Sequence, residues 1–320
     1  MGWRHRYIQS RSVYEICFRA REGIPLPCSE DMNFLVECAL SWTLRGKSLK
    51  LCHLIVMGNH IHILAIAYDP EEFVRFYGEL MKRLTDSVKR YTGKRHLNIW
   101  EKRAMVALVA DPAACIERIK YFYLNPARAH LSETIDSYPG VSSWRAFSQC
   151  THEGQKISTK KLPTILMTDI SSCIKNLKQT LTESAKERPR LSLSYHPFAW
   201  MEVFNLNDSI TKIKNSIINA IKLEEESLKI QRAKEHRKVA CLSKLRTQQA
   251  MAPFTPKKYG RKIFVLSSIK EIRISLIQHI QKLTTQCKAL YHKWKKGELP
   301  SFWPHGMFQP RAPLLVSLLA

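Results

Sequence analysis

Two histidines, His60 and His62, lie two residues apart within an apolar stretch that runs from residue 49 to residue 67. Two apolar runs separated by Gly58–Asn59 predict two strands joined by a tight turn. Successive side chains of a strand alternate between its faces, so both imidazoles project from one face, about 7 Å apart. Two imidazoles so placed can converge on one metal ion or one phosphate. A His-X-His strand can also form a plain polar outer face, but the apolar run from residue 63 to residue 67 argues against a solvated edge.

A predicted helix that begins at Asp111 and ends near Asn125 carries a second set of polar groups. Tyr121 and Asn125 are four residues apart and therefore stack on one helix face, with Arg118 one turn earlier on the same side. Tyr123 lies about 200° around the helix from Tyr121, so it faces elsewhere.

A tyrosine beside a carboxamide and two imidazoles can support phosphoryl transfer. In this hypothesis the phenol of Tyr121 attacks phosphorus, and a divalent cation held by His60, His62 and Asn125 offsets charge on the phosphate oxygens. Mixed nitrogen and oxygen ligands suit Mn²⁺ or Mg²⁺ better than a thiolate-rich zinc site would. A helical tyrosine taken alone is more often a core residue, and sequence spacing does not exclude that alternative.

The elements that must position these groups follow from the apolar periodicity. Strands are predicted over residues 13–18, 51–57, 61–67 and 104–109, and helices over residues 31–44, from residue 70 onward, and from residue 111 to about residue 124. The order β-α-β-β-α-β-α predicts an α+β fold, an antiparallel sheet with helices packed on it, close to a ferredoxin-like plan.

Residues 1–147 resemble the single-tyrosine HUH transposases, in particular the REP-associated tyrosine transposases. The resemblance rests on an ordered set of segments: VYEICFRAREG, MGNHIHIL, NIWEKR, IKYFYLNPARA and SYPGVSSW. It implies that His60 and His62 bind the metal, that Tyr121, four residues before the Asn-Pro, is the nucleophile, and that Asn125 completes the site. This chain has Gly58 where the family usually has proline, and His130 where a glycine is typical.

The implied activity is that of a DNA transposase, which cleaves and rejoins single-stranded DNA through a 5′-phosphotyrosine with Mg²⁺ or Mn²⁺ as cofactor. A replication-initiator or relaxase-like HUH nicking nuclease shares this chemistry, and a domesticated, non-catalytic DNA-binding protein is a third alternative. The expected partner is single-stranded or hairpin-forming DNA, without a small-molecule substrate. The sequence leaves open whether one chain builds the site or a homodimer shares it.

Charge is the strongest global signal, with 51 Lys and Arg against 27 Asp and Glu and a net charge of +24. Residues 1–150 carry 21 basic and 15 acidic side chains, a net of +6, so the remaining 30 and 12 give residues 151–320 a net of +18. This balance favours a nucleic-acid partner, with an anionic membrane surface as the lesser alternative. No apolar run approaches the ~20 residues of a membrane span, no signal peptide is evident, and nine scattered cysteines suggest no disulfide framework. We therefore expect a cytoplasmic, nucleoid-associated protein.

The predicted domain boundary lies between residues 147 and 148. Residues 148–320 form a basic, mainly helical region, with helices predicted over residues 165–181, 215–249 and 269–295. A basic loop there carries Lys257, Lys258 and Arg261 beside aromatic residues, and we predict that these three residues and Arg118 contact DNA. The region is expected to be either a DNA-binding extension or a solvated helical appendage.

Overall fold

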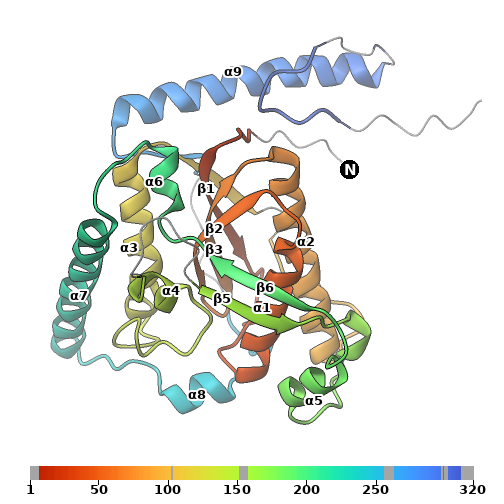
Figure 1. Ribbon diagram of the computed structural model, residues 1–320, viewed down its shortest axis with the longest axis vertical. Coiled ribbons are helices and arrows are strands. Elements are labelled where there is room, and N and C mark those ends of the chain that lie inside the picture. The colour runs from red at the N-terminus through yellow and green to blue at the C-terminus, as the bar shows by residue number, and fades with distance from the viewer. Residues whose placement is uncertain are drawn as a thin grey trace, which may run out of the picture.

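A computed structural model describes residues 7–101, 104–150, 158–255, 263–296, 298 and 302–310 of the chain. Its centre is a five-stranded sheet with the strand order β2-β3-β1-β4-β7 (Figure 1). The strands of this sheet are β1 (Ser12–Arg19), β2 (Leu49–Val56), β3 (His60–Ala67), β4 (Met105–Val109) and β7 (Val265–Leu266). All neighbours pair antiparallel except β4 and β7, which pair parallel at one edge. The predicted α+β class with an antiparallel sheet is confirmed.

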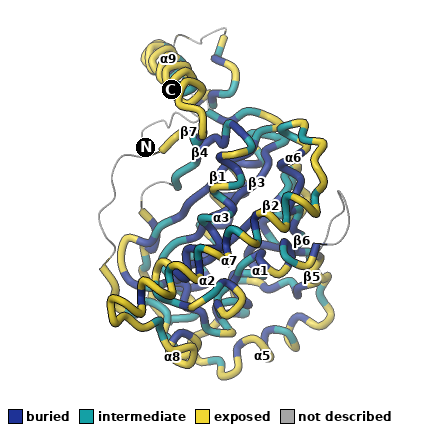
Figure 2. The backbone as a smooth tube through the Cα atoms, turned by 90° about the vertical axis from the view of Figure 1, so that its left-hand side faces the viewer, coloured by how far each residue is buried: buried dark blue, intermediate teal, exposed yellow. Residues whose placement is uncertain are grey.

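Helices cover both faces of this sheet and bury it. The helices α1 (Glu30–Leu44) and α2 (Pro70–Tyr91) lie on one face, and α3 (Pro112–Arg128), α4 (Trp144–Ser148), α6 (Ala199–Val203) and α7 (Ile210–Lys234) lie on the other (Figure 1). Strand alternation supplies both cores, since Tyr14 and Ile16 enter the core under α1 and α2 while Val13 enters the core under α3. The tube in Figure 2 is accordingly dark blue along the central strands.

The helices of the first half begin where the sequence predicts. Ser29 accepts a hydrogen bond from the Met32 amide at the start of α1, and Asp69 accepts two at the start of α2. Asp111 caps α3 in the same way, accepting from Ala114. These side chains satisfy amides that a helix leaves without partners at its N-terminus.

The helix α3 continues past the predicted stop at Asn125–Pro126 and ends at Arg128. A proline lacks the amide N–H needed for the helical hydrogen bond. The backbone φ that its ring fixes is nevertheless a helical value, so proline is tolerated in the last turn of a helix. Here the Pro126 carbonyl accepts from the Leu131 amide at 2.9 Å, which satisfies an acceptor at the helix end. The extension keeps Asn125 inside regular helix.

The second half contains a hairpin that the sequence pattern does not predict. Strands β5 (Ser158–Pro163) and β6 (Arg190–Tyr195) form a separate two-stranded sheet that lies against α1. The continuous helix predicted over residues 165–181 is wrong, because the segment holds only the short helix η1 (Met167–Asp169) and the start of α5 (Leu177–Ser184). Asn176, directly before α5, has a left-handed backbone with φ of 50°, which interrupts any longer helix.

The later helices agree with the predictions in part. The single helix predicted over residues 215–249 is instead α7, ending at Lys234, and the short α8 (Leu242–Thr247), since His236 is left-handed with φ of 52°. The helix predicted over residues 269–295 is α9 (Lys270–Lys295), which lies across one end of the molecule (Figure 1). No helix in the described part of the chain is long and apolar enough to cross a membrane.

Candidate functional site

The two histidines begin strand β3 and face helix α3. Their ring centroids are 5.1 Å apart, as expected for alternate residues of one strand face. His62 also contacts the rings of Tyr121 and Phe122 on α3, at 5.4 and 5.2 Å between centroids. The structure therefore brings together the His-X-His pair and the tyrosine that the sequence singled out.

Both histidines donate through Nδ1 and leave Nε2 for another partner. His62 Nδ1 lies 2.8 Å from Oε1 of Glu15, whose side chain is fully buried, and His60 Nδ1 lies 2.7 Å from Asn59 Oδ1. His62 Nε2 is buried and has no hydrogen-bond partner. A carboxylate that fixes one ring nitrogen while the other stays available is the usual arrangement around a metal-binding histidine.

Glu15 reaches its position because β1 pairs antiparallel with β3 in a register that places Cys17 opposite His62 and Arg19 opposite His60. Its carboxylate also binds Arg118 of α3, with Nη2 at 2.8 Å from Oε1 and Nε at 2.7 Å from Oε2. The Arg118 guanidinium in turn lies 4.0 Å from the centre of the Tyr121 ring, a cation–π contact. One buried carboxylate thus connects the histidine pair with the tyrosine.

The two tyrosines of α3 have different surroundings. Tyr123 is fully buried, and its hydroxyl bonds His53 Nδ1 at 2.7 Å and Ser143 Oγ at 3.0 Å, so it is a core residue. Tyr121 is half-buried, and no side-chain hydrogen bond in the described part of the chain involves its hydroxyl. Its oxygen is therefore available to a reactant, as an acceptor, donor or nucleophile.

Asn125 lies one helical turn after Tyr121 and is 8% exposed. Its Nδ2 is buried without a hydrogen-bond partner. A buried NH2 donor without a partner is costly, so Nδ2 points to an acceptor that the protein alone does not supply, such as a phosphate oxygen. The described residues hold no cluster of three His, Cys, Asp or Glu side chains suited to a metal. Two imidazoles and the amide oxygen of Asn125 are of the ligand types that suit Mn²⁺ or Mg²⁺.

Burial and charge set the protonation of these groups. Burial lowers the pKa of His60 well below its ordinary value, and the nearby His62 and Arg19 lower it further, so His60 is neutral. Burial also lowers the pKa of His62, but Cys17 and Glu15 outweigh it and raise the value to about 10. Without a metal His62 is therefore protonated on both ring nitrogens, and a cation bound at Nε2 would displace that proton. Burial raises the pKa of Glu15, yet His62 and Arg118 more than offset it, and the carboxyl is ionised.

Some predicted site residues stay untested. Lys257, Lys258 and Arg261 lie outside the described residues. The predicted DNA contact of Arg118 stays a prediction, because its guanidinium is engaged with Glu15 and only 20% of its side chain is exposed.

Sequence reasoning did not single out Glu15, Cys17 or Arg19. All three point to the same face of β1, beside the histidines. The available signal was an acidic residue inside the otherwise apolar VYEICF strand, where an unpaired charge would be costly. Such a residue calls for a cationic neighbour, but only the strand order and the position of α3 identify it.

The chain has a limited structural similarity to solved structures. No protein-family model matches the chain, and no curated protein matches it. One similar solved structure is described as that of a REP-associated tyrosine transposase bound to a REP hairpin. The two chains are 17% identical with a TM-score of 0.38, over 45% of this chain and 83% of the other. A match of this size does not identify an activity, so the function has to be argued from the site itself.

The two positions where the chain departs from the transposase pattern both have left-handed backbones. Gly58 has φ of 70°, an angle that a proline cannot adopt, so the turn before His60 is built differently from one containing proline. His130 has φ of 55°, in the region where glycine is favoured. The turn at Gly58 still delivers His60 and His62 to one strand face.

Proposed function

We propose that this protein is a DNA strand-transfer enzyme of the HUH type, which cleaves and rejoins single-stranded DNA through a covalent bond to Tyr121. The observation that carries the proposal is the position of Tyr121, a half-buried tyrosine whose hydroxyl has no side-chain hydrogen bond among the described residues. The centre of its ring lies 5.4 Å from that of His62, whose Nε2 is also without a hydrogen-bond partner. The net charge of +24 supports a phosphodiester substrate, because DNA binding by basic proteins releases the counterions condensed on the phosphates.

The chemistry exchanges one phosphodiester for another. The Tyr121 oxygen forms a bond to phosphorus and loses its proton to solvent, while the bond from phosphorus to the 3′ oxygen breaks and that oxygen takes up a proton. The 5′ phosphate stays on the tyrosine until a 3′-hydroxyl attacks phosphorus and displaces the phenolate. Since the diester bond is conserved at each step, no nucleotide hydrolysis is required.

The other site residues have supporting roles in this proposal. His60, His62 and Asn125 would hold Mg²⁺ or Mn²⁺, which offsets negative charge on the phosphate oxygens when bound. Arg118 keeps the Tyr121 ring against the site through its cation–π contact, and Glu15 fixes both Arg118 and His62.

Covalent trapping tests the proposal. Wild-type protein, Tyr121→Phe and Tyr123→Phe are incubated with labelled hairpin-bearing oligonucleotides and Mg²⁺, and adducts are separated on denaturing gels. Wild type and Tyr123→Phe should form the adduct, whereas Tyr121→Phe should form none yet bind DNA almost normally, since it loses only the nucleophilic hydroxyl. Joining of the cleaved ends would distinguish strand transfer from nicking alone.

Tyr123→Phe is a matched control that also loses one hydroxyl from the same helix. Because that hydroxyl is buried and bonded to His53 and Ser143, its loss should cost about 1–3 kcal/mol of folding stability but not activity. Reversed behaviour of the two variants would assign the chemistry to Tyr123. DNA binding by the wild type without any adduct would instead favour a non-catalytic DNA-binding protein.

A further inference from the structure

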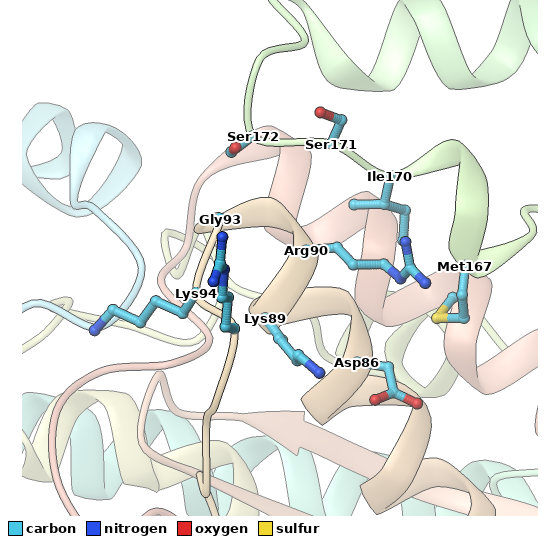
Figure 3. A pocket seen from close by; sticks show the side chains of 10 residues that line it. Asp86, Lys89, Arg90, Gly93, Lys94, Met167, Ile170, Ser171 and Ser172 are labelled. Carbon is cyan, nitrogen blue, oxygen red and sulfur yellow. The ribbon is translucent and has the colours of Figure 1, made fainter.

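A cavity of about 540 Å³ opens at the C-terminal end of α2, on the side of the sheet away from α3. Figure 3 shows the side chains that line it, from the last turns of α2, the segment after it, and the segment around Ser171 and Ser172. Its charged lining consists of four cations and one anion: Lys89, Arg90, Lys94, Arg95 and Asp86. We call this cavity the α2 basic pocket.

The cations of the α2 basic pocket lack acidic partners. None of the salt bridges between described residues involves Lys89, Arg90, Lys94 or Arg95, although other lysines around α1 and α2 are paired. Those paired lysines are Lys47 with Glu79, Lys160 with Glu37 and Lys178 with Glu30. Like charges that gather around a cavity repel one another, so an anionic occupant would stabilise the arrangement.

The helix dipole accounts for only part of this cluster. Lys89 and Arg90 are in the last turn of α2, where cations favourably face the helix C-terminus. Lys94 and Arg95 lie beyond the helix, and both are exposed. Gly93, with φ of 69°, allows a close approach to the opposite wall, since a Cβ there would meet Ser172 Oγ at 2.9 Å. The pocket therefore joins two separate segments around a cationic opening.

The chain leads directly from this pocket to the candidate active site. Ile99 is only four positions after Arg95 in the sequence, a span of at most about 14 Å. The Ile99 carbonyl accepts from the Arg21 amide at 2.8 Å, and the Glu101 amide donates to the Arg19 carbonyl at 2.8 Å. Arg19 is paired in register with His60. The α2 basic pocket and the histidine pair thus lie at the same end of the sheet.

We propose that the α2 basic pocket binds the phosphate backbone of the substrate DNA strand several nucleotides away from the bond that is cleaved. This inference rests on the proposed function for the identity of the strand. Adjacent strands are about 4.8 Å apart and the two residues from Arg21 to Arg19 span about 7 Å, so the main chain at Arg95 lies within about 31 Å of that at His60. A stacked strand rises about 3.4 Å per nucleotide, so about nine nucleotides cover this distance.

The test compares two triple variants that remove the same charge from the same side of the molecule. Arg90→Gln/Lys94→Gln/Arg95→Gln neutralises the pocket, and Lys47→Gln/Lys160→Gln/Lys178→Gln neutralises the paired lysines. Each lowers the net charge from +24 to +21. Binding of single-stranded oligonucleotides is measured against salt, with strands that extend either 3 or 12 nucleotides on each side of the cleavage site, and thermal melts confirm folding.

The pocket variant should lower the slope of log K against log salt by about 2 for the long strand, since each single-strand phosphate contact contributes about 0.7. It should leave binding of the short strand unchanged, and the control variant should resemble the wild type with both strands. Equal losses in the two triple variants would reduce the effect to net charge and overturn the proposal. An unchanged slope would do the same, as would pocket-dependent binding only to vesicles of anionic lipid.

These outcomes are independent of the chemistry at Tyr121. Suppose that the wild type forms no covalent adduct but the pocket variant still shows a lower slope of log K against log salt with the long strand. The proposed cleavage is then wrong, and the proposed DNA binding at the α2 basic pocket is supported. If adducts form normally and the slope is unchanged in the pocket variant, the proposed strand transfer is supported and the pocket proposal is overturned.

Discussion

At the scale of single residues, Glu15 has the most constrained position in the site. Its fully buried carboxylate is shared by His62 and Arg118, and it has no access to water. A buried charge in this position is stable only because both partners are present. The carboxylate fixes the tautomer of His62 and, through Arg118, the orientation of the Tyr121 ring. We therefore regard Glu15 as a positioning residue for both halves of the site.

We expect Glu15→Gln to weaken Mn²⁺ binding by about 10- to 100-fold, the usual effect of losing the carboxylate behind a metal-binding histidine. His62→Ala should abolish binding altogether, and Asn59→Ala, which removes the neutral partner of His60, should weaken it less. Calorimetric titration of Mn²⁺ into each folded variant measures the three effects. Unchanged affinity in Glu15→Gln would mean that the carboxylate serves only to neutralise Arg118.

The sequence could identify the members of this site but not the connection between them. Helical periodicity separates Tyr121 from Tyr123, and strand alternation places His60 with His62, because both depend on local geometry alone. The partners of Glu15 come from a neighbouring strand and from a helix that are 47 and 103 residues away in sequence. Only the strand order β2-β3-β1-β4 and the packing of α3 bring them together.

At the scale of elements, α7 supports the helix that carries the tyrosine. Arg232 of α7 donates to the Ala127 carbonyl at the end of α3 and forms an ion pair with Glu133. Glu225 accepts from the Ile135 amide at 2.6 Å and is 5% exposed. Burial raises the pKa of Glu225 from 4.5 to about 7. We therefore expect the packing of α7 on α3 to depend on pH.

The raised pKa of Glu225 sets the direction in which folding stability changes with pH. The folded state favours the protonated Glu225, so its contribution to stability is complete below about pH 4.5 and is lost as the pH rises through about 7. Glu225→Gln should match the wild type near pH 4.5 and be more stable at pH 8 by about 1–2 kcal/mol. This change in pKa corresponds to about 3 kcal/mol, and relaxation of the structure around the ionised carboxyl reduces it.

Denaturant unfolding at pH 4.5, 6 and 8 provides the measurement. Glu226→Gln, at the next and exposed position of α7, is the matched control and should show no such pH-dependent difference. A stability difference between Glu225→Gln and the wild type that is the same at every pH would show that the carboxyl does not titrate in this range.

The elements themselves were predictable to different degrees. Helices α1, α2 and α3 begin at side chains that cap them, and these caps are visible in the sequence as Ser29, Asp69 and Asp111. The β5–β6 hairpin was not predictable, because its strands are polar on the exposed side and are 26 residues apart. They become strands by pairing with each other and packing against α1, which is a tertiary effect.

At the scale of the whole molecule, the two halves of the chain share their hydrophobic cores. Leu162 belongs to the core under α1 and α2, and Trp200 and Ile217 belong to the core under α3, each at most 2% exposed. Removal of everything after Phe147 would therefore expose both cores to water, at about 1.5–3 kcal/mol for each large side chain. The excess charge of the second half has to be tested by substitution instead of truncation.

Helix α9 is suited to such substitutions, because Cys287 is its only buried residue. The helix is accordingly largely yellow in Figure 2. Lys282 and Lys293 of α9 and Lys296, which directly follows the helix, lie within about 60° of the helix circumference, so they form one basic stripe. No salt bridge in the described part of the chain involves them. If this stripe contacts DNA, neutralising all three with glutamine should lower the salt slope for single-stranded DNA by about 2.

Salt-dependent binding of one long oligonucleotide to wild type and to this triple variant measures the effect. The variant with the three paired lysines neutralised, at positions 47, 160 and 178, again serves as the control of equal net charge. A lower slope only in the α9 variant would place DNA along α9, at the opposite end of the sheet from the histidine pair. A slope equal to that of the wild type would contradict the prediction. The net charge of +18 on residues 151–320 would then act through surfaces other than this helix.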